Sequence, residues 1–215
     1  MISRTKNFLF IHVPKTGGNS VSTALQTYTD IQFMEANSPK GLGVSENFWP
    51  IDPIFGSIKH FSVDKWCELL GKSISDYFIF STVRNPIDRA ISLYFFMKQT
   101  LIHKQISWLE DNSEDARDRL SKSEFRNFLL SGVQSQLSFV KSSAGLDIHL
   151  MRFERLVDDF AAVCRQLGLN EASLPVINAS RRPPLKRLLD AGNQKLLAEV
   201  FEDDFRSFGY GYELE

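Results

Sequence analysis

The stretch "FLFIHVPKTGGNSVSTAL", residues 8–25, passes from an apolar run through a glycine-bearing turn into a helical pattern. The run at residues 7–13 is nearly continuous and includes β-branched residues, which is typical of a strand buried on both faces of a parallel sheet. From Asn19 onward, apolar residues recur at helical spacing. The stretch therefore predicts a strand, a tight turn and a helix.

Two later segments repeat this order. "DYFIFSTV" at 76–83 predicts a second buried strand, and Asn85 and Pro86 suit the N-cap and first position of a helix that continues to about residue 98. "DIHLMRF" at 147–153 predicts a third strand, followed by a helix. Because parallel neighbours need crossover connections, which are usually helical, we expect an α/β fold with a mostly parallel sheet.

Other segments are assigned from their caps and composition. Ser62 suits the start of a short helix through Leu70, and residues 34–54 suit a long surface loop. The remaining helical predictions are an exposed helix within 101–122 that could lie over the active site, a helix at 123–132, a helix that stops at Gly168, and a single last helix carrying Leu197, Val200, Phe201 and Phe205.

The composition is that of a globular protein, and the length of 215 residues suits a single domain over residues 1–215. A net charge of −1 argues against a generally basic nucleic-acid binder, so any anion site must be local. Cys67 and Cys164 lack the spacing of a zinc site or a disulfide framework. The N-terminal apolar run is too short to span a membrane, so we expect no transmembrane segment and a cytoplasmic protein.

The turn at residues 14–20 could bind an anion. Gly17 and Gly18 allow a sharp turn and close approach of the ligand, and the first N–H groups of the following helix point toward it. Lys15 can add a positive charge, and three neighbours can add side-chain donors: Thr16, Asn19 and Ser20. The G-x-x-x-x-G-K-[ST] order of nucleotide triphosphate loops is absent, so taken alone an ordinary turn with a solvated lysine explains the pattern equally well.

A second group of polar residues lies in "TVRNPIDRAISLY" at 82–94. Arg84 falls where the second strand ends, and Ser92 lies within two turns of the next helix. Arginine suits fork-like recognition of a phosphate, to which Ser92 could donate a hydrogen bond. For Arg89 we favour a structural role, with a surface carboxylate as its partner.

"HVPKTGGNS" followed by "STVRNPIDRAISLY" resembles the two cofactor-binding motifs of sulfotransferases that use 3′-phosphoadenosine 5′-phosphosulfate (PAPS), especially carbohydrate-type and bacterial members. Similar segments extend from about residue 7 to the end, and Asn19 departs from the hydroxyl residue of many members. The resemblance implies a P-loop-like three-layer fold, no required metal, and a first loop that holds the 5′-phosphosulfate. Lys15 would contact the transferred group or bridging oxygen, while Arg84 and Ser92 would hold the 3′-phosphate.

The transfer requires a base, and histidine suits that role near neutral pH. His60 ends "FGSIKHF", where a strand entering the site would finish, and the resemblance places a catalytic histidine in the corresponding segment. We expect His12 to brace the loop, His103 to be solvated and His149 to be structural. Glu154 is a weaker alternative base.

The irregular segment "NASRRPP" at 178–184 offers Arg181 and Arg182. Arg182, with its neighbour, could supplement the 3′-phosphate site or bind an anionic acceptor, but exposed arginines stiffened by prolines fit equally well. Three aromatic residues could line an acceptor site, although scattered aromatics are more often core: Phe48, Trp49 and Trp108.

The sequence thus favours a sulfotransferase that moves a sulfuryl group from PAPS to a hydroxyl acceptor, a carbohydrate or small metabolite. His60 would take the acceptor proton, while Lys15 and the loop amides would stabilise the departing phosphate. A nucleotide-dependent kinase with an atypical phosphate loop and a nucleotide-binding protein without turnover are the alternatives.

Overall fold

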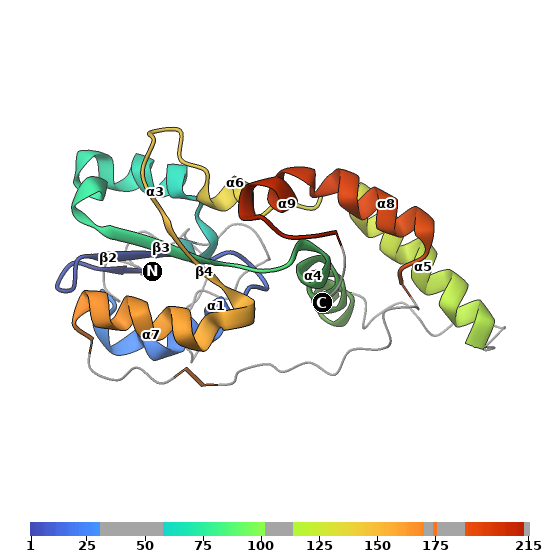
Figure 1. Ribbon diagram of the computed structural model, residues 1–215, viewed down its shortest axis with the longest axis horizontal. Coiled ribbons are helices and arrows are strands. Elements are labelled where there is room, and N and C mark those ends of the chain that lie inside the picture. The colour runs from blue at the N-terminus through green and yellow to red at the C-terminus, as the bar shows by residue number, and fades with distance from the viewer. Residues whose placement is uncertain (31–57, 102–113, 170–173, 176–187, 213–215) are drawn as a thin grey trace. The chain divides into compact units, whose positions relative to one another are not determined.

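The computed structural model describes residues 1–30, 58–101, 114–169, 174–175 and 188–212, which belong to two compact units (Figure 1). The first unit is made from Met1–Arg84 and Gln136–Ile177, and the second from Asn85–Ser135 and Asn178–Glu215.

The first unit contains a sheet whose described strands have the order β1-β2-β3-β4. The strands are β1 (Ile2–Ser3), β2 (Phe8–Ile11), β3 (Phe78–Val83) and β4 (His149–Arg152). β2, β3 and β4 pair in parallel, whereas the two-residue β1, too short to leave a sequence pattern, pairs antiparallel with β2. The predicted α/β fold with a mostly parallel sheet is confirmed, and so are all three predicted strands.

Helices cover both faces of this sheet. Figure 1 shows α1 (Gly18–Ala24) and α7 (Leu156–Leu167) on one face and α3 (Val63–Leu70) on the other. The described residues of this unit also form α6 and four short 3₁₀ helices: α6 (Leu137–Val140), η1 (Gln26–Tyr28), η2 (Ile58–His60), η3 (Gly71–Asp76) and η4 (Phe153–Arg155). These layers agree with the P-loop-like arrangement that the resemblance implies.

Local sequence signals determine the ends of these helices. The Ser62 hydroxyl accepts a hydrogen bond from the Lys65 N–H at 3.4 Å, and Gly71 follows the last turn of α3 with a φ of 59°. Gly168 ends α7 in the left-handed conformation, with a φ of 60°. Both predicted helix ends are confirmed.

The core of the first unit is aromatic and lies around β2 and β3. Phe10 and Phe80 are fully buried, with ring centroids 5.2 Å apart. Val21 of α1 and Phe160 of α7 belong to the same buried cluster, so these helices pack their apolar residues against the sheet. Burial of this apolar area supplies the main driving force for the unit.

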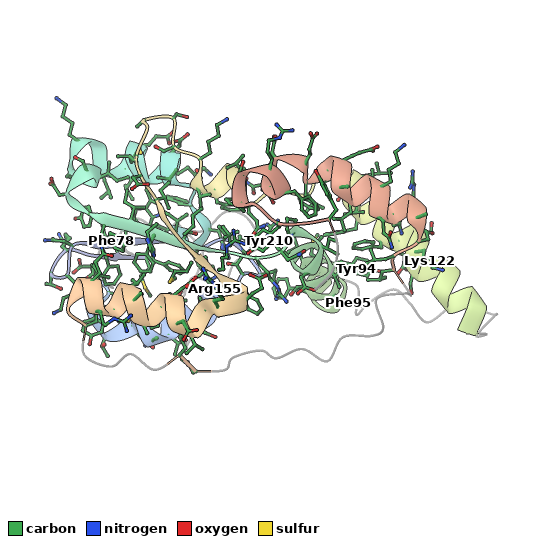
Figure 2. All side chains as sticks on the ribbon, viewed as in Figure 1. Phe78, Tyr94, Phe95, Lys122, Arg155 and Tyr210 are labelled. Carbon is green, nitrogen blue, oxygen red and sulfur yellow. The ribbon has the colours of Figure 1, made fainter. Side chains whose placement is uncertain are left out.

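The described residues of the second unit are mainly helical. Its elements are α4 (Pro86–Leu101), α5 (Glu114–Leu130), α8 (Ala191–Val200) and α9 (Glu202–Phe208). The Asn85 side chain accepts a hydrogen bond from the Ile87 N–H at 2.9 Å, as expected for the start of α4. Tyr94 of α4, which Figure 2 labels, donates to Glu124 of α5 at 2.9 Å.

Among the described residues of this unit, helices form where the sequence predicts them, but their predicted division into separate helices is wrong in two places. The helices expected within 101–122 and at 123–132 are joined from Glu114 to Leu130 as α5. The single last helix is interrupted at Phe201, where φ and ψ are −111° and 22°. Three acidic residues, from Glu202 to Asp204, stand in the first turn of α9, where they interact favourably with the helix dipole and support a new helix start.

The prediction that Arg89 pairs with a surface carboxylate is also wrong. Arg89 is only 1% exposed, and its Nη1 donates to the Gln134 carbonyl at 2.9 Å. Burial lowers the pKa of Arg89 to about 10, while the carboxylate of Asp204, itself fully buried, acts in the opposite direction. Arg89 therefore remains a cation at neutral pH inside the core of the second unit.

The loop predicted at residues 34–54 lies outside the described residues, as does the irregular segment at 178–184. Across the part of the chain that the structure describes, no helix is both long enough and apolar enough to cross a membrane.

Replacing Arg89 with Met should destabilise the protein by about 3–5 kcal/mol, because the buried carboxylate of Asp204 loses its compensating charge. Urea denaturation would measure this loss. The double variant Arg89→Met/Asp204→Leu should lose much less than the sum of the two single variants. Arg126→Met on the exposed face of α5 is the control, with an expected change within about 0.5 kcal/mol. Additive single effects would exclude a buried charge pair.

Candidate functional site

The loop after β2 and the residue after β3 lie beside each other. Nη1 of Arg84 donates to the carbonyl oxygen of Lys15 at 3.4 Å. Below this contact, the Thr16 hydroxyl donates to the Val13 carbonyl at 2.8 Å and lies 2.6 Å from the Thr82 hydroxyl. The two positive side chains predicted to bind a cofactor are thus carried by one connected structure.

The backbone of the loop has a conformation that most residues avoid. Lys15 has a φ of 69° and Gly17 a φ of 85°, so both lie in the left-handed region. Glycine adopts this conformation without steric cost, whereas lysine does not. Tertiary contacts on both sides of the loop therefore have to hold Lys15 in place.

The two glycines are required by close packing. A Cβ at Gly17 would lie 2.9 Å from Cδ2 of Phe153 and 2.9 Å from Cδ2 of Leu156, and one at Gly18 would clash with Cδ2 and Nε2 of His12. The backbone of the loop therefore lies directly against the side chains around it. Neither position can therefore carry a larger residue unless these neighbours move.

Contacts hold both the guanidinium and the backbone of Arg84. Only 5% of the residue is exposed, and its guanidinium lies 4.0 Å from the centroid of the Phe153 ring. Its N–H and C=O form hydrogen bonds with the side-chain amide of Gln136, both at 2.8 Å. The sequence-based prediction missed Phe153 and Gln136, because a single aromatic residue and a single glutamine carry no spacing signal.

His12 packs between the loop and His60. It is 4% exposed, and its ring centroid is 4.7 Å from that of His60. Burial lowers the pKa of His12 well below its ordinary value, and positive charge on His60, Lys59 and Lys15 lowers this pKa further. His12 is therefore neutral near pH 7, and its ring serves as packing against Gly18.

The contact between the two histidines determines the tautomer of His60. Nδ1 of His60 lies 3.0 Å from the His12 carbonyl oxygen, which can only accept a hydrogen bond. Nδ1 therefore carries the proton, and in the neutral ring Nε2 carries the lone pair. The prediction that a strand ends at His60 is wrong, because residues 58–60 form the 3₁₀ helix η2.

The other predicted site residues differ in how far they are buried, and some lie outside the described residues. Thr16 is buried with its hydroxyl proton donated to Val13, so its backbone N–H is what it can offer an anion. Asn19 is exposed and Ser20 half-buried at the start of α1, while Ser92 is 9% exposed on α4 of the second unit. Arg181 and Arg182 lie outside the described residues, as do His103 and the three aromatic residues proposed for an acceptor site.

Two further candidates for the base are placed differently: His149 lies at the far end of its strand, and Glu154 is exposed. His149 begins β4, so it lies at the end of the strand opposite to the carboxyl edge, with its ring 5.6 Å from that of Phe78, the residue labelled in Figure 2. Glu154 lies on η4 and is exposed. Among the described residues, no cluster of three or more His, Cys, Asp or Glu side chains could hold a metal ion.

Comparison with known families identifies the class of protein that this fold and site define. The model of the sulfotransferase family matches residues 1–211, which is nearly the whole chain. The chain therefore belongs to the sulfotransferase family, and its activity is the transfer of a sulfuryl group. Comparison with curated proteins and with solved structures finds no match.

The contact between Gly18 and His12 predicts the effect of adding one methyl group. Gly18→Ala should destabilise the protein by about 1–3 kcal/mol, because the new Cβ would overlap the buried imidazole. Thermal and urea denaturation would measure the loss. Gly192→Ala, within helix α8, is the matched control and should be neutral or slightly stabilising. A Gly18→Ala protein as stable as the parent would contradict the close packing.

Proposed function

We propose that the protein transfers a sulfuryl group from PAPS to a hydroxyl group, and that the loop at residues 14–20 and Arg84 bind the two ends of this donor. The observation that carries the proposal is the hydrogen bond of 3.4 Å between Arg84 and the Lys15 carbonyl. It gives one edge of the sheet two cations and a turn whose backbone is bare at Gly17 and Gly18. Such a site suits a ligand with two separate anionic groups.

The loop is the proposed seat of the 5′-phosphosulfate. Lys15 supplies a flexible positive charge, and the first N–H groups of α1 have no acceptor within the helix, because the Gly17 carbonyl receives its first hydrogen bonds from Ser20 and Val21. Gly17 and Gly18 carry no side chain that could stand between the backbone and a ligand. The residues present therefore fit a phosphosulfate group.

Arg84 is the proposed partner of the 3′-phosphate. The central carbon of its guanidinium lies 4.0 Å from the centroid of the Phe153 ring, a contact that restricts the movement of the group that a phosphate would meet. Ser92 and Arg182 are proposed to add further hydrogen bonds to the same phosphate, as the resemblance implies. This division of roles supports selection of a nucleotide that is phosphorylated at both positions.

His60 is the proposed base. Its Nδ1–H is fixed by the His12 carbonyl, so Nε2 can accept the proton of the acceptor hydroxyl. The bound donor supplies the sulfuryl group. A bond forms from the acceptor oxygen to sulfur, and the bond between sulfur and the 5′-phosphate oxygen breaks. Lys15 stabilises the negative charge left on that phosphate, and no metal is required for this step.

The acceptor is proposed to be a carbohydrate or a small metabolite with a free hydroxyl group. The support is the resemblance of the two motifs to those of carbohydrate-type sulfotransferases. Fold and donor site do not define an acceptor, so a panel of saccharides and small alcohols is the appropriate substrate set.

Lys15→Met should reduce sulfuryl transfer by about 10²–10³-fold, because the cation that stabilises the leaving phosphate is lost. Mass spectrometry of the acceptor panel after incubation with PAPS would detect the gain of one sulfonate. Lys72→Met, at an exposed position in η3, is the matched control and should retain full activity. Equal activity of the Lys15→Met protein would exclude the role proposed for this residue.

His60→Ala should reduce the transfer rate by about 10²–10⁴-fold while leaving the affinity for 3′-phosphoadenosine 5′-phosphate unchanged, because the base acts only in the chemical step. Added imidazole should restore part of the rate. His149→Ala removes the same ring from the opposite end of the sheet and should have no such effect. A His60→Ala protein that binds the nucleotide poorly and does not respond to imidazole would show a structural role instead.

A further inference from the structure

Arg84 stands just beyond the end of the sheet. β3 ends at Val83, whose partner in the parallel register is Arg152 of β4, and Arg84 is the next residue. The ladder therefore does not fix the backbone of the residue that carries the guanidinium. A small rotation there would move the head of so long a side chain by a large distance.

The side chain of Gln136 continues the ladder by one residue. Its Oε1 accepts from the Arg84 N–H at 2.8 Å, and its Nε2 donates to the Arg84 carbonyl at 2.8 Å. A primary amide has the same donor and acceptor as a peptide group, so this pair of bonds imitates the contact that a neighbouring strand would make. Gln136 is fully buried, which strengthens both bonds and makes their loss costly.

Gln136 is itself held by its local structure. It precedes the short helix α6, and its carbonyl accepts a hydrogen bond from the Phe139 N–H at 3.0 Å. Phe139 and Val140 are buried within the same helix. Gln136, whose side-chain amide binds the backbone of Arg84, is thus held in place by a packed helix.

We infer that Gln136 is a positioning residue that aims Arg84 at the 3′-phosphate of the donor and so sets the selectivity for nucleotides that carry this group. The inference rests on the proposed function. The amide of Gln136 fixes the backbone of Arg84, while Phe153 and the Lys15 carbonyl fix its guanidinium. With both ends fixed, the guanidinium is ordered before any ligand arrives, which reduces the entropic cost of binding.

The test compares two nucleotides that differ only at the 3′ position. Calorimetry would measure the affinities of the parent protein and of Gln136→Met for 3′-phosphoadenosine 5′-phosphate and for adenosine 5′-monophosphate. Methionine has a similar length but can neither donate to the Arg84 carbonyl nor form a comparable bond to its N–H. The preference for the 3′-phosphorylated nucleotide should fall about ten- to a hundredfold, with the affinity for the monophosphate nearly unchanged.

Gln134→Met is the matched control, because its side chain is exposed and stands two residues away. It should keep the parent selectivity. If the parent protein itself does not prefer the 3′-phosphorylated nucleotide, the proposed role of Arg84 fails and this inference fails with it. If the parent shows the preference and Gln136→Met retains it, or loses affinity for both nucleotides equally, the inference alone is overturned.

A second variant covers the case in which Gln136→Met does not fold. Gln136→Glu retains an oxygen for the Arg84 N–H but cannot donate to the Arg84 carbonyl when it is ionised. It should show an intermediate loss of selectivity. Unchanged selectivity in a folded Gln136→Glu protein would contradict the inference in the same way.

Discussion

The parallel pairing of β2 with β3 is the constraint on which the site depends. Parallel strands deliver their carboxyl ends to the same edge of a sheet, so the chain leaving each strand must turn there. Contact between the Thr16 and Thr82 hydroxyls then joins the two exits below the surface. With the exits joined, the cations at positions 15 and 84 are carried by a rigid base even though they are 69 positions apart in the chain.

His12 remains neutral at this edge of the sheet, so its ring can pack beside the positive side chains without adding to their charge. His12 lies among positive neighbours, and burial prevents it from gaining a charge of its own. Its Nδ1 has no hydrogen-bond partner among the described residues. A protonated ring would add repulsion toward Lys15, whereas the neutral ring packs against Gly18. The backbone carbonyl of His12 accepts the hydrogen bond from His60.

The sequence predicts the parts of this arrangement that depend on local pattern. Apolar runs located β2, β3 and β4, and the capping residues Ser62 and Gly168 located helix ends, because these signals act over a few residues. The contributions of Phe153 and Gln136 depend on chain segments that meet only after folding, so no local pattern reveals them. The break before α9 was missed because its apolar residues continue the same helical spacing on both sides.

The left-handed backbone of Lys15 has a consequence for engineering. A residue with a Cβ loses about 1–2 kcal/mol in this conformation, a cost that glycine avoids and asparagine reduces. Selection of a library for thermal resistance alone would therefore favour glycine or asparagine at position 15 and discard the lysine. An enzyme stabilised in this way would be a poorer catalyst, so stability and activity have to be selected together.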